Sequence, residues 1–193
     1  LEGKLEPRRH RHAGGHRRQL LLRRVLGPAD GVVEGGGDQI LEHVAVVADQ
    51  AVAVTLRGAR AIPADKILVA SHGQTLTAGA AKVRGVAGRH VGPITLFHVQ
   101  LGPVSIYHGG DSAYVPVADC PAHLAFLPVG RPSPTASPAY ALKMALDVKP
   151  KAVVLMHGRD EEYAEFKKLA AKELPGVAVE VGEPIKAKVV RLD

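Results

Sequence analysis

The chain has 193 residues, which is enough for one domain with a sizeable core, and 46% of them are apolar, so a folded globule is expected. No apolar run approaches the roughly 18 residues that a membrane span needs, and the sequence therefore predicts no membrane segment. The single cysteine, Cys120, excludes an internal disulfide and, together with the lack of a signal-peptide pattern, favours a cytosolic (cytoplasmic) protein.

The net charge of +6 comes from the first 24 residues. They hold eight Lys or Arg and two acidic residues, whereas the rest of the chain carries seventeen of each sign. Such a leader attracts phosphates, so nucleic-acid binding through residues 1–24 is one hypothesis and a solvated, disordered tail is the other. The leader has no aromatic side chain on which a base could stack. We expect residues 1–24 to be a separate leader and residues 25–193 to form a single domain.

The N-terminal part of that domain gives weak signals of secondary structure. Residues 39–54 are apolar with scattered polar positions, a pattern that slightly favours a helix over a strand. Short strands are predicted at residues 66–70 and 82–86, with a turn at residues 73–74. The next elements are a hairpin of residues 94–100 and 104–108, joined by Leu-Gly-Pro, and a buried strand at residues 122–129.

From Ser137 onward, helices and strands alternate. Ser137 and Pro138 are suited to opening a helix, because Ser accepts from free N–H groups and Pro fits the first helical position. The Lys-Pro pair at residues 149–150 ends that helix. A strand at residues 152–156, an amphipathic helix at residues 160–173, and strands at residues 177–181 and 185–192 complete the chain. This pattern predicts a sheet with helices packed on it.

Three side chains of the types that bind metals follow predicted strands. His90 and His157 each come after a strand and lie close to glycine, and Asp111 follows a strand and two glycines. Strand ends are rigid and open into loops, which is where α/β folds place ligands. Imidazole and carboxylate ligands together are typical of a zinc site. The alternative is that each histidine is a hydrogen-bonded structural residue.

Five runs between residues 82 and 193 resemble the lactonase-like, largely uncharacterised branch of the metallo-β-lactamase superfamily. Residues 107–112, Tyr-His-Gly-Gly-Asp-Ser, resemble the family's Tyr-His-Ala-Gly-Asp-Thr motif. Residues 123–130, 150–157 and 180–183 are similar to later family motifs, in family order and at roughly family spacing, and residues 84–90 resemble the strand and histidine before the first motif. The resemblance covers residues 82–193.

The resemblance implies an αββα fold of the α+β class, a metallo-β-lactamase-like β-sandwich flanked by helices, with an N-terminal half that is incomplete or divergent. It also implies a divalent metal, zinc with manganese or iron as alternatives. His90 and His157 would be metal ligands, and Asp111 would be a ligand and the catalytic residue. His108 would lie beside the site. The expected reaction is hydrolysis of an ester, amide, lactone or phosphodiester bond.

The family's principal metal motif, His-x-His-x-Asp-His, is missing. The histidines at positions 10, 12 and 16 have the wrong spacing, and His43 and His72 lack the partners that would complete the motif. His123 stands where the family has Asp, and the nearest acid is Asp119; we expect His123, Thr95 and His98 to be ordinary strand residues. Three hypotheses therefore stay open: a metal-dependent hydrolase, a non-catalytic relative that serves as a binding or structural module, and a nucleic-acid-binding protein.

Overall fold

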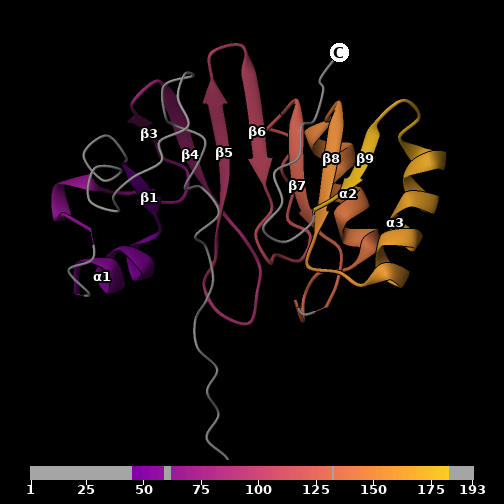
Figure 1. Ribbon diagram of the computed structural model, residues 1–193, viewed down its shortest axis with the longest axis horizontal. Coiled ribbons are helices and arrows are strands. Elements are labelled where there is room, and N and C mark those ends of the chain that lie inside the picture. The colour runs from indigo at the N-terminus through magenta and orange to yellow at the C-terminus, as the bar shows by residue number, and fades with distance from the viewer. Residues whose placement is uncertain (1–44, 59–61, 132, 183–193) are drawn as a thin grey trace, which may run out of the picture.

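A computed structural model describes residues 45–58, 62–131 and 133–182 of the chain. The basic leader, His43 and the predicted strand at residues 185–192 lie outside these ranges. Within them the elements in chain order are β1 (Val46–Ala48), α1 (Gln50–Gly58), the 3-10 helix η2 (Ala64–Lys66), β2 (Ile67–Val69), β3 (Thr75–Ala78), β4 (Ala81–Ala87), β5 (Thr95–Leu101), β6 (Val104–His108), β7 (Leu124–Pro128), α2 (Pro138–Val148), β8 (Ala152–Met156), α3 (Asp160–Glu173) and β9 (Ala178–Val181), as Figure 1 shows.

Most of the described strands form one mixed sheet of seven, in the order β3-β4-β5-β6-β7-β8-β9. The strands from β3 to β6 pair antiparallel, whereas β6, β7, β8 and β9 pair parallel. Because β4 and β6 are both antiparallel to β5, they run in the same direction as β7 and β8. The loops that follow β4, β6, β7 and β8 therefore leave the sheet at one edge.

The two-stranded sheet β1–β2 packs on one face of the large sheet, over β3, β4 and β5. Side chains on β1 and β2 alternate between two environments, as they do in extended strands. Val47 and Leu68 pack with Phe97 and Val99 of β5. The alternate side chains turn the other way and pack with Ala53 of α1. On this side the order of layers is large sheet, small sheet, α1.

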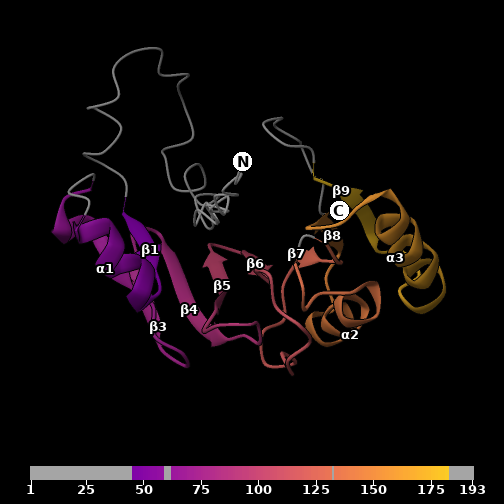
Figure 2. The ribbon, with the colours of Figure 1, turned by 90° about the horizontal axis from the view of Figure 1, so that it is seen from below.

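Helices α2 and α3 cover the opposite face. Along β5, Leu96 points away from Phe97 and Val99 and joins a separate core with both helices. That core contains Met144 of α2 and Phe166 of α3, neither of which exposes any surface. Figure 2 shows α1 and β1 at one end of the molecule and α2 and α3 at the other. The layers are thus α1, small sheet, large sheet, α2 with α3, and the expectation of an αββα arrangement is confirmed.

The structure confirms most of the elements predicted after residue 80. The two helices, the β5–β6 hairpin and the strands β4, β7, β8 and β9 all lie within a few residues of their predicted limits. Gly102, in the two-residue connection of the hairpin, has φ of 55°, a value that favours glycine. Before residue 80 the prediction was partly wrong, because the described part of residues 39–54 begins with β1 and only then becomes α1, and β3 was not predicted.

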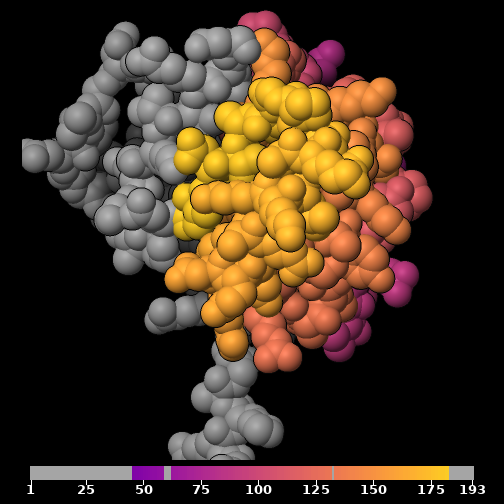
Figure 3. All heavy atoms as spheres, turned by 90° about the vertical axis from the view of Figure 1, so that its right-hand side faces the viewer, coloured from indigo at the N-terminus to yellow at the C-terminus, as the bar shows by residue number. Residues whose placement is uncertain are grey.

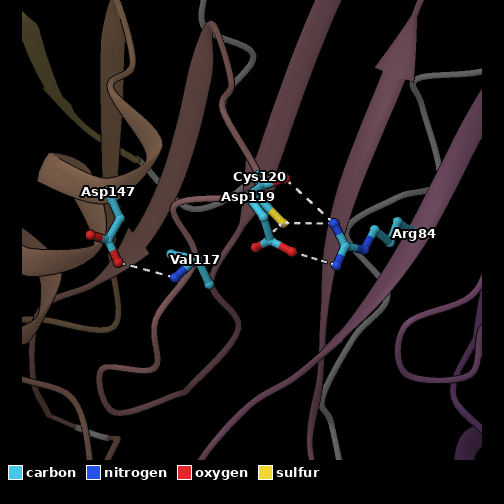
Figure 4. Close-up of polar contacts among 5 residues, drawn as sticks. All are labelled: Arg84, Val117, Asp119, Cys120 and Asp147. Carbon is cyan, nitrogen blue, oxygen red and sulfur yellow. Dashed lines mark hydrogen bonds and ion pairs between the residues drawn. The ribbon is translucent and has the colours of Figure 1, made fainter.

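Two acidic side chains anchor the long connection from β6 to β7 through the contacts in Figure 4. Asp147 of α2 accepts a hydrogen bond from the backbone N–H of Val117 at 3.0 Å. Asp119 pairs with Arg84 of β4 at 2.6 Å, and the guanidinium group lowers the pKa of that carboxyl. Cys120, next to it, is fully buried. These contacts fix the connection against both α2 and the sheet.

Among the described helices, none has the length and apolar character needed to cross a membrane.

Candidate metal centre

Asp111 lies in a tight turn directly after β6, at the edge where the parallel strands end. Gly110 has φ of 55°, and a Cβ atom on it would lie 3.1 Å from Ile94 Cδ1. A Cβ atom on Gly109 would lie 3.1 Å from the ring of Pro128. The two glycines therefore let the turn pack between the β4–β5 loop and β7. They place the Asp111 side chain at the edge of the sheet.

Two hydroxyl groups hold the backbone of Asp111. Ser133 Oγ and Thr135 Oγ1 each donate a hydrogen bond of 2.8 Å to its carbonyl oxygen. Both come from the loop between β7 and α2, and Ser133 is buried, with 3% of its surface exposed. The next side chain, Ser112, accepts a 2.8 Å bond from the N–H of Arg89. Asp111 is thus fixed from the loops on both sides of it.

The structure brings Asp111 and His157 together. His157 Nε2 lies 2.8 Å from Asp111 Oδ1, with 7% of the Asp111 side chain and 36% of the His157 side chain exposed. His157 directly follows β8 and has φ of 51°, which is rare outside glycine and is concentrated at functional sites. Two of the three predicted ligands are therefore in contact at a partly open site.

His108 lies beside this pair, at the end of β6. Its ring stacks on Phe126 of β7 with 5.7 Å between centroids, and its Nδ1 accepts a 3.2 Å bond from the N–H of Gly110. Burial, followed by repulsion from His157, lowers the pKa of His108 to about 4, although Asp111 opposes that shift. A neutral His108 supports the Asp111 turn through Gly110. His108 therefore lies beside the Asp111–His157 pair, and its role next to a metal stays a prediction.

His90 lies on the neighbouring loop between β4 and β5. The backbones of Arg89 and Ala113 pair there as an antiparallel bridge, with a 2.8 Å bond from Ala113 N to Arg89 O. That bridge pairs the residue before His90 with the residue two positions after Asp111, so the two loops lie side by side. Its Nε2 atom is buried and makes no hydrogen bond within the described residues. A buried imidazole nitrogen without a partner is unusual and calls for an explanation.

The donors at this edge have the chemistry of a zinc, manganese or iron site, namely two imidazoles and a carboxylate. Asp111 and His157 are in contact. The buried Nε2 of His90 can accept or donate one further bond. Over the described ranges, however, the structure contains no group of three or more His, Cys, Asp or Glu side chains arranged to hold one ion. The roles of His90, Asp111 and His157 as metal ligands stay predictions.

Glu162 of α3 organises the loops next to His157. Its carboxylate accepts the backbone N–H of Arg159 at 2.7 Å and that of Arg131 at 3.3 Å. A Cβ atom on Gly130 would lie 2.5 Å from this carboxylate, so a side chain there would displace it. Glu162, Ser133 and Thr135 were not predicted from the sequence. Only Glu162 had a readable signal, because an acidic residue three positions after a helix cap is typical of helix starts.

Three other histidines discussed from the sequence have hydrogen-bond partners outside the Asp111–His157 pair. His123 precedes β7, at the opposite end of that strand, and its Nδ1 accepts the N–H of Ser105 at 3.1 Å. His98 Nε2 is 2.9 Å from the carbonyl of Pro121. His72 Nε2 is 3.0 Å from Thr95 Oγ1. Each therefore has a structural partner, as expected for ordinary residues of the sheet.

No family model matches the chain, and no curated protein matches it in sequence. Solved structures do match. A protein from Parabacteroides distasonis assigned as a metal-dependent hydrolase gives a TM-score of 0.57 at 21% identity, over 71% of this chain and 63% of its own. A metallo hydrolase from Ignicoccus hospitalis gives 0.56 at 18% identity, over 72% and 65%. The metallo-β-lactamase fold protein YhfI from Bacillus subtilis gives 0.51 at 16% identity, over 61% and 53%.

This chain has the metallo-β-lactamase fold over its matched part. The chain spans less than two thirds of the length of each of these three structures, at 63%, 65% and 53%. At these identities the likeness establishes the fold alone. The fold expected from the short motifs is confirmed. The function is inferred below from the residues of the candidate site.

Proposed function

We propose that this metallo-β-lactamase-fold chain is a metal-dependent hydrolase whose centre includes Asp111 and His157. The observation that carries the proposal is the 2.8 Å approach of His157 Nε2 to Asp111 Oδ1 at the carboxyl edge of the sheet. His90, whose buried Nε2 has no hydrogen bond within the described residues, would be the third ligand. Zinc is the proposed metal, with manganese or iron as alternatives.

Each residue has a separate task in this proposal. When bound, the metal supplies Lewis-acid chemistry, lowering the pKa of water and polarising the bond to be cleaved. Asp111, which is 7% exposed, supplies negative charge that favours a cation, and Ser133 and Thr135 hold its backbone. His108 holds the turn through Gly110. The substrates considered are esters, amides, lactones and phosphodiesters.

Metal content and hydrolysis test this function together. Purified protein is expected to contain or take up one zinc, manganese or iron ion, and to hydrolyse an ester or a phosphodiester. His157→Ala and Asp111→Asn should each lose most of the metal and the activity. His123→Ala, which alters a histidine at the opposite end of β7, should lose neither. Protein that binds none of these metals and cleaves no substrate of these classes would reject the proposal.

One observation favours a second candidate, a non-catalytic relative that serves as a binding module. Across the described ranges no three metal-binding side chains form a group that could hold an ion. A stable, monodisperse protein that stays metal-free in the presence of excess zinc would support this candidate. Nucleic-acid binding through residues 1–24 has no structural observation behind it, and it stays a prediction from charge alone.

A further inference from the structure

Two arginines lie next to each other beside His157. Arg131 follows β7 and Arg159 precedes α3, and one carboxylate, that of Glu162, accepts the backbone N–H of both. Arg159 is two residues from His157, so their Cα atoms are at most about 7 Å apart. Both loops leave the sheet at the edge that carries Asp111. The pair is therefore part of the rim of the candidate site.

The side chains of this pair are open to solvent. Arg131 and Arg159 are exposed, and no hydrogen bond or ion pair joins either guanidinium group to another described residue. By contrast, Arg84 is engaged by Asp119 at 2.6 Å. Guanidinium groups are well suited to planar, two-point recognition of oxyanions such as phosphate. Two such groups on adjoining loops could each donate hydrogen bonds to one anion.

Acidic residues lie close to this pair, so recognition of an anion would depend on direct guanidinium contacts and not on the net local charge. Glu162 keeps its negative charge while it accepts the backbone N–H groups of both arginines. Asp160 and Glu161 begin α3, and both residues are exposed. Figure 3 shows the face of the molecule on which α3 and β9 lie. The N-terminal turn of this helix also presents N–H groups that favour anions. Asp111, at the same edge, faces His157.

We infer that Arg131 and Arg159 form an anion-binding subsite at the rim of the Asp111–His157 centre, and that the substrate is a phosphodiester. This inference rests on the proposed hydrolytic function. Of the bonds considered, the ester, amide and lactone are neutral, and only the phosphodiester has the negative charge that two guanidinium groups recognise. The arginines hold the phosphate through ground-state contacts, so their loss weakens substrate binding more than it slows the chemical step.

Steady-state kinetics of the metal-loaded protein test the subsite. With bis(4-nitrophenyl) phosphate, Arg131→Gln and Arg159→Gln are each expected to raise KM about tenfold, the loss that one charge-assisted hydrogen bond represents, with kcat retained. Lys168→Gln, which removes an exposed cation elsewhere on α3, should leave KM unchanged. With neutral 4-nitrophenyl acetate, none of the three changes should matter. Unchanged KM for the phosphodiester, or an equal rise for the neutral ester, overturns the inference.

Calorimetric binding of inorganic phosphate separates this subsite from the hydrolase proposal. The wild-type chain should bind phosphate with an affinity that falls as salt rises, and both arginine variants should bind it about tenfold more weakly. If hydrolysis is absent but this dependence on the arginines is seen, the hydrolase proposal fails and the anion site stands. If phosphate binding is absent or equal in all variants while neutral esters are cleaved, the anion site fails and the hydrolase proposal stands.

Discussion

At the scale of single residues, the backbone of His157 carries a cost that its position explains. With φ of 51° it occupies the left-handed region, which disfavours every residue with a Cβ atom by about 1–2 kcal/mol. The same torsion turns the imidazole back toward the end of β6, where Nε2 meets Asp111. A strained histidine next to a carboxylate is what a site selected for function, at the expense of stability, would contain.

Replacing His157 with glycine should separate strain from contact. His157→Gly is expected to be about 1 kcal/mol more stable than His157→Ala, because both lose the imidazole and only glycine accepts this φ without strain. Urea unfolding measures the difference. Lys149, at the end of α2, has φ of 53° and is a matched control, since Lys149→Gly and Lys149→Ala should differ by a similar amount. Equal stability of the two His157 variants would show that the backbone there relaxes.

The two hydroxyl groups on the Asp111 carbonyl give a second prediction. Ser133→Ala should lower the free energy of unfolding by about 1 kcal/mol, the usual net worth of a buried hydrogen bond. Thr135→Val should act in the same direction, whereas Thr135→Ser keeps the hydroxyl and should stay near wild type. Because both bonds end on one oxygen, the double variant should depart from the sum of the single ones. Strict additivity in the urea series would argue against a shared role.

At the scale of elements, α2 begins at a cap that can be tested alone. Ser137 has extended backbone, and its Oγ accepts the N–H of Tyr140 at 3.2 Å, with Pro138 at the first helical position. Ser137→Ala should cost about 1 kcal/mol, while Ser137→Asp should retain stability. Ser71→Ala changes an exposed serine outside any helix and should have no effect. A loss below about 0.3 kcal/mol, measured by thermal or urea unfolding, would mean that the cap is redundant.

Elements with local signals were the ones predictable from sequence. The cap at Ser137, the amphipathic pattern of α3 and the unbroken apolar run of β8 each identify an element without reference to the rest of the chain. Strand β1 has three residues and pairs in parallel with β2, across α1, so its partner is distant in sequence. Its side chains face two different cores, which removes the alternation by which an exposed strand is recognised.

The candidate site residues could be predicted from the sequence only where they directly follow a recognisable strand. Asp111 follows β6 and His157 follows β8, the strands on either side of β7, so a parallel arrangement puts both residues at one edge of the sheet. The supports of the site were not predictable, because Ser133, Thr135 and Glu162 act on backbone groups of residues that are distant in the chain. Such contacts depend on how loops pack, and a sequence pattern contains no record of it.

At the scale of the whole molecule, the core on the helical side of the sheet contains two acidic protons. Cys120 and Tyr107 are both buried, with no exposed surface, and both belong to that core. Burial and then the nearby Asp119 carboxylate raise the pKa of the Cys120 thiol from 9.0 to about 11, against the effect of Arg84. Burial also raises the pKa of the Tyr107 phenol. Neither group can ionise in place without weakening the core.

These two groups predict a loss of stability in alkali. In each case the folded state has the higher pKa, so their contribution is complete below about pH 9, the pKa of an unperturbed thiol, and falls as the pH rises toward 11. Urea unfolding between pH 8 and pH 11 should show a declining free energy, with a flatter decline in Cys120→Ala and in Tyr107→Phe. Tyr140→Phe, which changes a tyrosine that is 36% exposed, should follow the wild-type curve. Should Cys120→Ala and Tyr107→Phe both decline as steeply as wild type, alkaline unfolding would have to begin outside this core.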